Sequence, residues 1–464
     1  MTRLFLLALL AAHASAADRF PVDWSKTNAE LLEHYTALLK IDTTSPPGNE
    51  TKAVTYVKAV LDREGIPNEV LAADPNRANL VARLKGNGSK RPVILMGHTD
   101  VVGVQRENWP SDPFGAVRKD GYIYGRGTLD DKDNLSTALM TMLLLKRLNV
   151  RLDRDVILVA EAGEEGSTAV GIDFLVSKHW DKIAAEFALA EGGGGVSRNG
   201  QVVYRTIDTT EKVILRCKLI ASGTAGHGSQ PRPDNAVVRL STAVSKVAAW
   251  QTPMRLNDTT RTYFERLAGV SAGEASDRYL HLSDPARTAE IQRFFSANEL
   301  QHNSMLRTTI TPTVLNAGFR YNVIPSQAEA TLDIRALPDE DPAKFFEEMK
   351  RVIGDSSIEV VREPQYRPPA APSRLDSEMF RTLEQAARDL SPRTVTLPTM
   401  TTGATDKAQL RAKGVQAYGI GPLIEDRDKN LGGAHSDDER ILEANLYDFM
   451  KFVWGAATSI AASK

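Results

Sequence analysis

Strand-like and helical segments alternate along the first two hundred residues, and this alternation limits the fold more than any other feature. Apolar runs at residues 93–96, 156–160 and 187–190 are bounded by turn residues, which is typical of buried strands. Amphipathic helical spacing separates them, for example over residues 135–148. Strands that alternate with helices favour an α/β fold whose sheet is mostly parallel.

A different pattern occupies the middle of the chain. Between residues 209 and 365 the predicted order is strand, helix, strand, strand, helix, strand, which is the ferredoxin-like arrangement. An extra segment, residues 251–305, lies between the first helix and the second strand of this order. The α/β pattern then resumes and runs to the C-terminus. We therefore expect a large discontinuous domain, residues 17–208 and 366–464, interrupted by an inserted domain of residues 209–365.

The first sixteen residues have the features of a secretory signal peptide. Arg3 precedes an apolar run at residues 4–12, and residues 14–16 form an A-x-A cleavage site. A membrane-spanning helix needs about 20 apolar residues, and this run is too short. No later segment is long enough to span a membrane. We predict that the protein is exported and is periplasmic or secreted after removal of residues 1–16.

The charge balance and the cysteine count exclude several kinds of site. Lys and Arg number 57 against 59 Asp and Glu, so the chain has no basic excess for nucleic acid or a membrane surface. Cys217 is the only cysteine, so neither an intrachain disulfide nor a cysteine-rich zinc site can form. Any metal ion must be held by His, Asp and Glu.

Potential metal ligands follow three of the predicted strands. His98 comes just after the first strand named above, Glu164 and Glu165 follow the second, and Glu191 follows the third. Open α/β sheets bind ligands at the carboxyl ends of their strands. Asp100 lies two residues beyond His98, where it can accept a proton from the second imidazole nitrogen. These residues are therefore expected to meet at one edge of the sheet.

Two more candidates complete this set. Asp130 lies in a Gly-rich turn before the helix at residues 135–148, and His435 lies in a late loop between Gly and Asp. Asp130 as a helix N-cap, and the glutamate pair as a solvated turn, are the alternatives. If one glutamate of the pair binds a metal, the other is free to handle a proton. Five oxygen and nitrogen ligands are enough for two adjacent divalent ions that share one carboxylate.

The ordered set of motifs resembles the M20 family. It comprises His98-Thr99-Asp100, residues 109–114, Gly125-Arg126-Gly127 with Asp130 and Lys132, Glu164-Glu165, Glu191-Gly192, Gly226-His227-Gly228-Ser229 and His435. The family contains zinc amidohydrolases and exopeptidases, among them acetylornithine deacetylases and succinyl-diaminopimelate desuccinylases, and its carboxypeptidase S-like and aminoacylase-like members look nearest. The resemblance implies a zinc-exopeptidase catalytic domain whose inserted domain serves as a lid or a dimerisation domain.

The resemblance also implies how the ligands are divided. Asp130 would bridge two divalent ions, with zinc expected first and cobalt or manganese as alternatives. His98 and Glu191 would complete one site, and Glu165 and His435 the other. A cis peptide bond would follow Asp130, as it does in relatives.

Further residues receive roles on the same basis. Glu164 would be the general base that takes a proton from the attacking water and passes it to the leaving amine. His227, in the inserted domain, would stabilise the developing oxyanion, and in dimeric relatives it reaches the partner's site. Asp100 would complete the catalytic set by orienting His98. A homodimer through the inserted domain is implied as well.

Four residues are expected to contact the substrate. Arg335 and Asn322 would hold its carboxylate or carbonyl, and Gly403 and Thr405 come from a motif that is similar to carboxypeptidase S-like members. A different interpretation of Arg335 is that it pairs with Asp333 or caps a strand.

The predicted function is an exported dizinc hydrolase that cleaves peptide or N-acyl amide bonds next to a free carboxylate. A two-metal aminopeptidase of the same fold is the alternative within enzymes. A peptide-binding protein on a retired scaffold is disfavoured because every expected ligand and the base are present. The segment 251–305 is expected to alter dimer contacts or reshape the pocket, through Tyr263 and Phe264.

Overall fold

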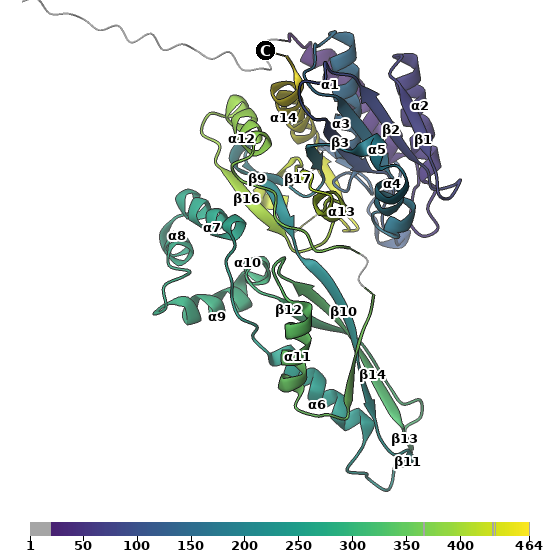
Figure 1. Cartoon of the computed structure of the whole chain (residues 1–464), viewed down its shortest axis with the longest axis vertical. Coiled ribbons are helices and arrows are strands. Elements are labelled where there is room, and N and C mark those ends of the chain that lie inside the picture. The colour runs from purple at the N-terminus through teal and green to yellow at the C-terminus, as the bar shows by residue number, and fades with distance from the viewer. Residues whose placement is uncertain (1–19, 365–366, 429–430, 432, 464) are drawn as a thin grey trace, which may run out of the picture.

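The computed structural model describes residues 20–364, 367–428, 431 and 433–463 (Figure 1). The predicted signal peptide, residues 1–16, lies outside the described residues. Among the described helices, none combines the length and the apolar character that crossing a membrane requires. Figure 1 shows a large sheet covered by helices and, below it, a smaller elongated sheet.

The large sheet has ten strands in the order β1-β2-β6-β3-β7-β17-β9-β8-β18, with β16 also paired to β9. The strands are β1 (Asn68–Leu71), β2 (Asn79–Leu84), β3 (Val93–His98), β6 (Val156–Glu161), β7 (Phe187–Ala190), β8 (Gly194–Arg198), β9 (Gln201–Glu211), β16 (Thr396–Thr401), β17 (Gln416–Gly419) and β18 (Leu423–Glu425). The four central strands β6, β3, β7 and β17 are parallel, which confirms the predicted sheet type. Their carboxyl ends therefore share one edge of the sheet.

Helices cover both faces of this sheet. One face packs against α1 (Trp24–Leu39), α2 (Glu50–Arg63), α3 (Lys132–Arg147), α12 (Glu378–Leu390) and α14 (Glu443–Ala461). The other packs against α4 (Ile172–Lys178), α5 (Trp180–Ile183) and α13 (Lys407–Ala412). Alternate residues of each central strand enter the two cores: Leu95 and Leu158 face one helix layer, and Ile94 and Ile157 face the other. This double burial explains why these strands are continuous apolar runs.

The small sheet is antiparallel, in the order β12-β14-β10-β15. Its strands are β10 (Val213–Ser222), β12 (Thr309–Ala317), β14 (Gln327–Ala336) and β15 (Ile358–Arg362), and α6 (Ala236–Ala249) and α11 (Pro342–Ile353) cover one face. The chain order is the predicted β-α-β-β-α-β. Asp341 starts α11 because its carboxylate accepts the backbone N–H groups of residues 343 and 344. The division into two domains stays a prediction, and only Lys212 separates β9 of the large sheet from β10 of the small one.

The segment 251–305 forms four helices, α7 (Asp258–Val270), α8 (Gly273–Leu280), α9 (Thr288–Asn298) and α10 (Leu300–Met305). They share an apolar core with Leu397 and Met400 of β16, so they pack against the large sheet. Tyr263 and Phe264 are buried in this core. Neither side chain lines the cleft described below, so the expectation that they reshape the pocket is not met.

Several short elements lie outside the predicted set. Strands β4 (Val117–Lys119), β5 (Tyr122–Tyr124) and β19 (Arg440–Leu442) form a three-stranded sheet, and β11 (Gly226–His227) pairs with β13 (Val323–Ile324). Strands β8 and β9 form a hairpin that joins Arg198 to Gln201. Its turn residues Asn199 and Gly200 both have positive φ, as a tight hairpin turn requires.

Candidate metal centre

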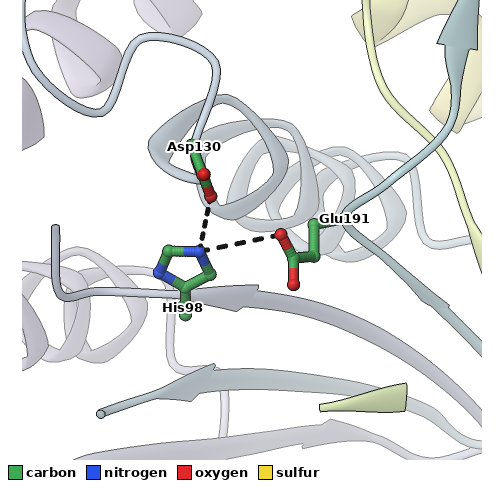
Figure 2. Close-up of side chains that lie close together, drawn as sticks. All are labelled: His98, Asp130 and Glu191. Carbon is green, nitrogen blue, oxygen red and sulfur yellow. Dashed lines mark hydrogen bonds and ion pairs between the residues drawn. The ribbon is translucent and has the colours of Figure 1, made fainter. Parts of the chain in front are cut away.

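The predicted ligands meet at the carboxyl edge of the large sheet. His98 is the last residue of β3, Glu191 directly follows β7, and Glu165 lies in the loop after β6. Asp130 immediately precedes the turn into α3, and His435 comes from the loop before β19. Figure 2 shows the side chains of His98, Asp130 and Glu191 converging from three separate elements.

The ligand atoms form two groups that share Asp130. In the first, His98 Nε2 lies 2.8 Å from Asp130 Oδ1 and 3.9 Å from Glu191 Oε2. In the second, His435 Nε2 lies 3.1 Å from Asp130 Oδ2 and 2.8 Å from Glu165 Oε1. Within each group the ligand atoms all lie within 4.8 Å of one another. Asp130 thus presents a different oxygen to each group, as a bridging carboxylate must.

Hydrogen bonds of the neighbouring residue Asp131 fix the turn that carries Asp130. The Asp130–Asp131 peptide bond is cis, which confirms the prediction. Asp131, not Asp130, is the N-cap residue of α3, so the N-cap interpretation of Asp130 is wrong. Asp131 accepts hydrogen bonds from the backbone N–H of His98 at 3.1 Å and from Asn134 at 2.6 Å. The backbone of His98 is therefore bonded directly to the turn that carries Asp130.

The buried carboxylate of Glu439 holds the Gly-rich part of the same turn. It accepts hydrogen bonds from Arg126 Nη1 at 2.6 Å and from the backbone N–H of Leu129 at 2.8 Å. Burial raises the pKa of Glu439 to about 7, although the positive charge of Arg126 opposes this. Sequence reasoning missed this residue, because nothing near Glu439 in the sequence points to a partner over 300 positions away.

Asp100 lies beside the second imidazole nitrogen of His98, as expected, and also holds a neighbouring loop. The second imidazole nitrogen of His98, Nδ1, lies 3.0 Å from the backbone oxygen of Asp100 and 3.5 Å from its carboxylate. The carboxylate accepts the backbone N–H groups of Glu164 and Glu165, each at 3.1 Å. Both the backbone oxygen and the carboxylate of Asp100 thus lie near His98 Nδ1, and the carboxylate also holds the loop of the glutamate pair.

Glu164 belongs to neither ligand group, and its carboxylate pairs with Arg367 instead. Its Oε1 accepts a hydrogen bond from Arg367 Nη2 at 2.6 Å, and Arg367 Nη1 donates to Asp406 at 2.8 Å. Burial raises the pKa of Glu164 to about 8, and the charge of Arg367 opposes that shift. Among the described residues, the ligand groups contain Glu165 and not Glu164. Arg367 was missed because local spacing gives no sign of its partner Glu164, 203 positions away.

The donor set fits two divalent cations. It contains imidazole nitrogens and carboxylate oxygens without sulfur, a combination that suits zinc and also manganese or cobalt. Burial, together with the nearby charges of Glu164 and Asp130, raises the pKa of Glu191 well above its ordinary value. Its buried Oε1 has no hydrogen-bond partner in the described part of the chain. Bound cations would neutralise the negative charge of these closely spaced, buried carboxylates.

A cleft of about 620 Å³ opens beside the metal centre. Its lining includes Glu165 and His435 of the metal centre, Arg335 of β14, and Gly403. The guanidinium of Arg335 donates to Asp333 at 2.8 Å. This is the ion pair that the sequence analysis gave as the other interpretation of Arg335. Thr405 does not line the cleft: it is buried, and its hydroxyl and backbone N–H donate to Glu211.

His227 and Asn322 lie far from the metal centre. His227 belongs to β11, and Figure 1 shows β11 and β13 at the end of the small sheet remote from the large one. The exposed imidazole lies 2.8 Å from Ser229 Oγ. The backbone oxygen of Asn322 accepts the N–H of Gly228 at 2.9 Å, so both residues share this tip. The structure therefore does not bring these two residues to the metal centre of their own chain.

The comparison with known families decides which family this is. Residues 94–458 match the model of "Peptidase family M20/M25/M40". The chain belongs to this family. It is therefore grouped with hydrolases of amide bonds, in agreement with the resemblance.

Known relatives cover most of the chain. The N-fatty-acyl-amino acid synthase/hydrolase PM20D1 of Homo sapiens is 30% identical over 68% of this chain and 64% of its own length. A probable succinyl-diaminopimelate desuccinylase of Staphylococcus aureus is 26% identical over 86% of this chain and 91% of its own. A metallo-carboxypeptidase of the M20 family from Sulfolobus solfataricus has the same fold, with a TM-score of 0.70, 20% identity, and coverage of 93% of this chain and 99% of that one.

Metal content tests the sharing of Asp130. Loaded with zinc and desalted, the protein should hold about two ions per chain. Asp130→Asn should lower binding at both sites because both groups use this carboxylate, and His435→Asn should empty one. Elemental analysis measures the content, with Asp112→Asn, an exposed carboxylate, as the control. An Asp130→Asn protein that holds as much zinc as the unchanged protein would contradict the shared role.

Proposed function

We propose that this protein is a two-metal hydrolase that cleaves a peptide or N-acyl amide bond next to a free carboxylate. The observation that carries the proposal is the Asp130 carboxylate shared by two ligand groups, with Glu164 held beside it at a cleft. Residues 1–16 support export of the mature chain.

His98, Asp130 and Glu191 would hold one ion, and Asp130, Glu165 and His435 the other. The ions would polarise the scissile carbonyl and lower the pKa of the attacking water. Glu164 takes a proton from that water and later gives it to the leaving amine.

Arg367 supports Glu164 in this role by holding one of its carboxylate oxygens in place. The second oxygen of Glu164 remains to accept the proton. Because the side chain is only 9% exposed, few water molecules compete with the attacking one.

His227 and Asn322 would act on a second copy of the chain. Both lie at the remote tip of the small sheet, so a partner's cleft is a more accessible target than their own. The edge strand β12 supports such a dimer, because Val314 and Leu315 are about half exposed on it. In this arrangement His227 donates to the developing oxyanion at the partner's site.

Two observations support a substrate with a free carboxylate: the names of relatives and the arginines that line the cleft. The human relative is named as a synthase/hydrolase of N-fatty-acyl amino acids, and the Sulfolobus protein as a carboxypeptidase. Guanidinium groups of the small sheet line the cleft, and they match a carboxylate better than a free ammonium group. This favours the present proposal over an aminopeptidase.

Glu164→Gln tests the proposed base. Gln is nearly isosteric but cannot accept the proton, so turnover of N-acyl amino acids should fall by about 10²–10⁴ while both ions stay bound. Glu165→Gln is the matched comparison, because it should weaken metal retention instead. Initial rates and elemental analysis measure both effects. Loss of a metal ion from Glu164→Gln would reverse the roles proposed for the pair.

Subunit mixing tests the proposed action of His227. His227→Ala should lower turnover by about 10²–10³, the effect of losing one oxyanion donor, without loss of metal. Mixing His227→Ala with Glu164→Gln subunits creates one complete site in each heterodimer if His227 acts on its partner. Activity should then return. If the mixture stays as inactive as its components, His227 does not serve a second copy.

A further inference from the structure

Three arginines line the cleft beside the metal centre: Arg216 of β10, Arg335 of β14, and Arg367. Arg216 and Arg335 lie on the face of the small sheet that α6 and α11 leave open. Their neighbours in sequence, Leu215 and Ile334, are buried under those helices, and successive side chains of a strand point to opposite faces.

Two of these guanidinium groups are already engaged. Arg335 Nε and Nη2 donate to the two oxygens of Asp333, at 2.8 and 3.1 Å. Arg367 donates to Glu164 and to Asp406, as described above. The side chain of Arg216 is exposed and makes no hydrogen bond or ion pair with any residue that the structure describes.

Asp333 explains why Arg216 is unpaired. It lies directly opposite Arg216 in the register of β10 and β14, and it lies two residues before Arg335 on the same strand. All three side chains therefore share one face. The Cβ atoms of directly opposite residues in an antiparallel pair lie within about 5.5 Å of each other. Arg335 donates to both oxygens of Asp333, and among the described residues no hydrogen bond or ion pair joins this carboxylate to Arg216.

We propose that Arg216 binds the free carboxylate of the substrate, and that Arg335 is a positioning residue that holds Asp333 away from it. This inference rests on the proposed function. A guanidinium offers two parallel donors that match two carboxylate oxygens. Arg216 has both donors of such a pair available, whereas Arg335 already uses its Nε and Nη2 on Asp333.

The first test compares an N-acyl amino acid with its carboxamide. The unchanged protein should prefer the free acid by about 10- to 100-fold in kcat/KM, the range for a charged hydrogen bond. Arg216→Gln should bring this ratio close to one, mainly through KM. Lys218→Gln is the control, because Lys218 lies on the same face of β10 but is paired with Glu329 at 2.9 Å and does not line the cleft.

The outcomes separate the two levels of the proposal. If the unchanged protein already treats acid and amide alike, the free-carboxylate part of the proposed function fails, and the role of Arg216 fails with it. If the unchanged protein discriminates and Arg216→Gln discriminates as strongly, only the assignment to Arg216 is overturned.

The second test distinguishes Arg216 from Arg335 by binding alone. Calorimetry in the Glu164→Gln background gives the dissociation constants of the acid and the amide without turnover. Arg335→Gln should remove the preference for the acid, because the released Asp333 then pairs with Arg216. Adding Asp333→Asn should restore the preference about 10-fold or more. If the double variant remains indifferent, Arg335 itself is the receptor and the proposal is wrong.

Discussion

The carboxylate of Asp130 presents one oxygen to His98 and the other to His435, and the arrangement of the site depends on this double contact. A carboxylate can serve two ligand groups only if its backbone is held firmly. Three elements that are distant in sequence provide that support: β3 through the His98–Asp131 hydrogen bond, the start of α3, and the Arg126–Glu439 pair. Breaking a buried ion pair of this kind costs about 3–5 kcal/mol, so the turn is strongly constrained.

The parallel sheet brings the other ligands to this point. Because β3, β6 and β7 run in the same direction, the residues at their carboxyl ends meet at one edge. The small sheet contributes Arg216 and Arg335 to the lining of the cleft, while the backbone N–H groups of Glu164 and Glu165 are held by the carboxylate of Asp100.

The sequence predicts those parts of the site that have a local signal. Continuous apolar strands followed by His98, Glu191 and the glutamate pair could be recognised, because position at a strand end determines where a side chain lies. The hairpin at Asn199-Gly200 also had a local signal, the Asn-Gly turn, but it was overlooked.

Long-range pairs could not be predicted in this way. Glu439 with Arg126, and Arg367 with Glu164, join residues that are 313 and 203 positions apart, and neither pair leaves a trace in local spacing. Thr405 matched a motif, yet its partner Glu211, 194 positions away, makes it a buried anchor. Tyr263 and Phe264 were assigned to the pocket because nothing near them shows that β16 would cover them.

Anomalous diffraction from crystals of the zinc-loaded protein tests the central claim most directly, since it locates each ion independently of activity. The account predicts two anomalous peaks, one beside His98 and Glu191 and one beside Glu165 and His435, with a different oxygen of Asp130 bound to each. A single peak, or two peaks of which only one contacts Asp130, would contradict it.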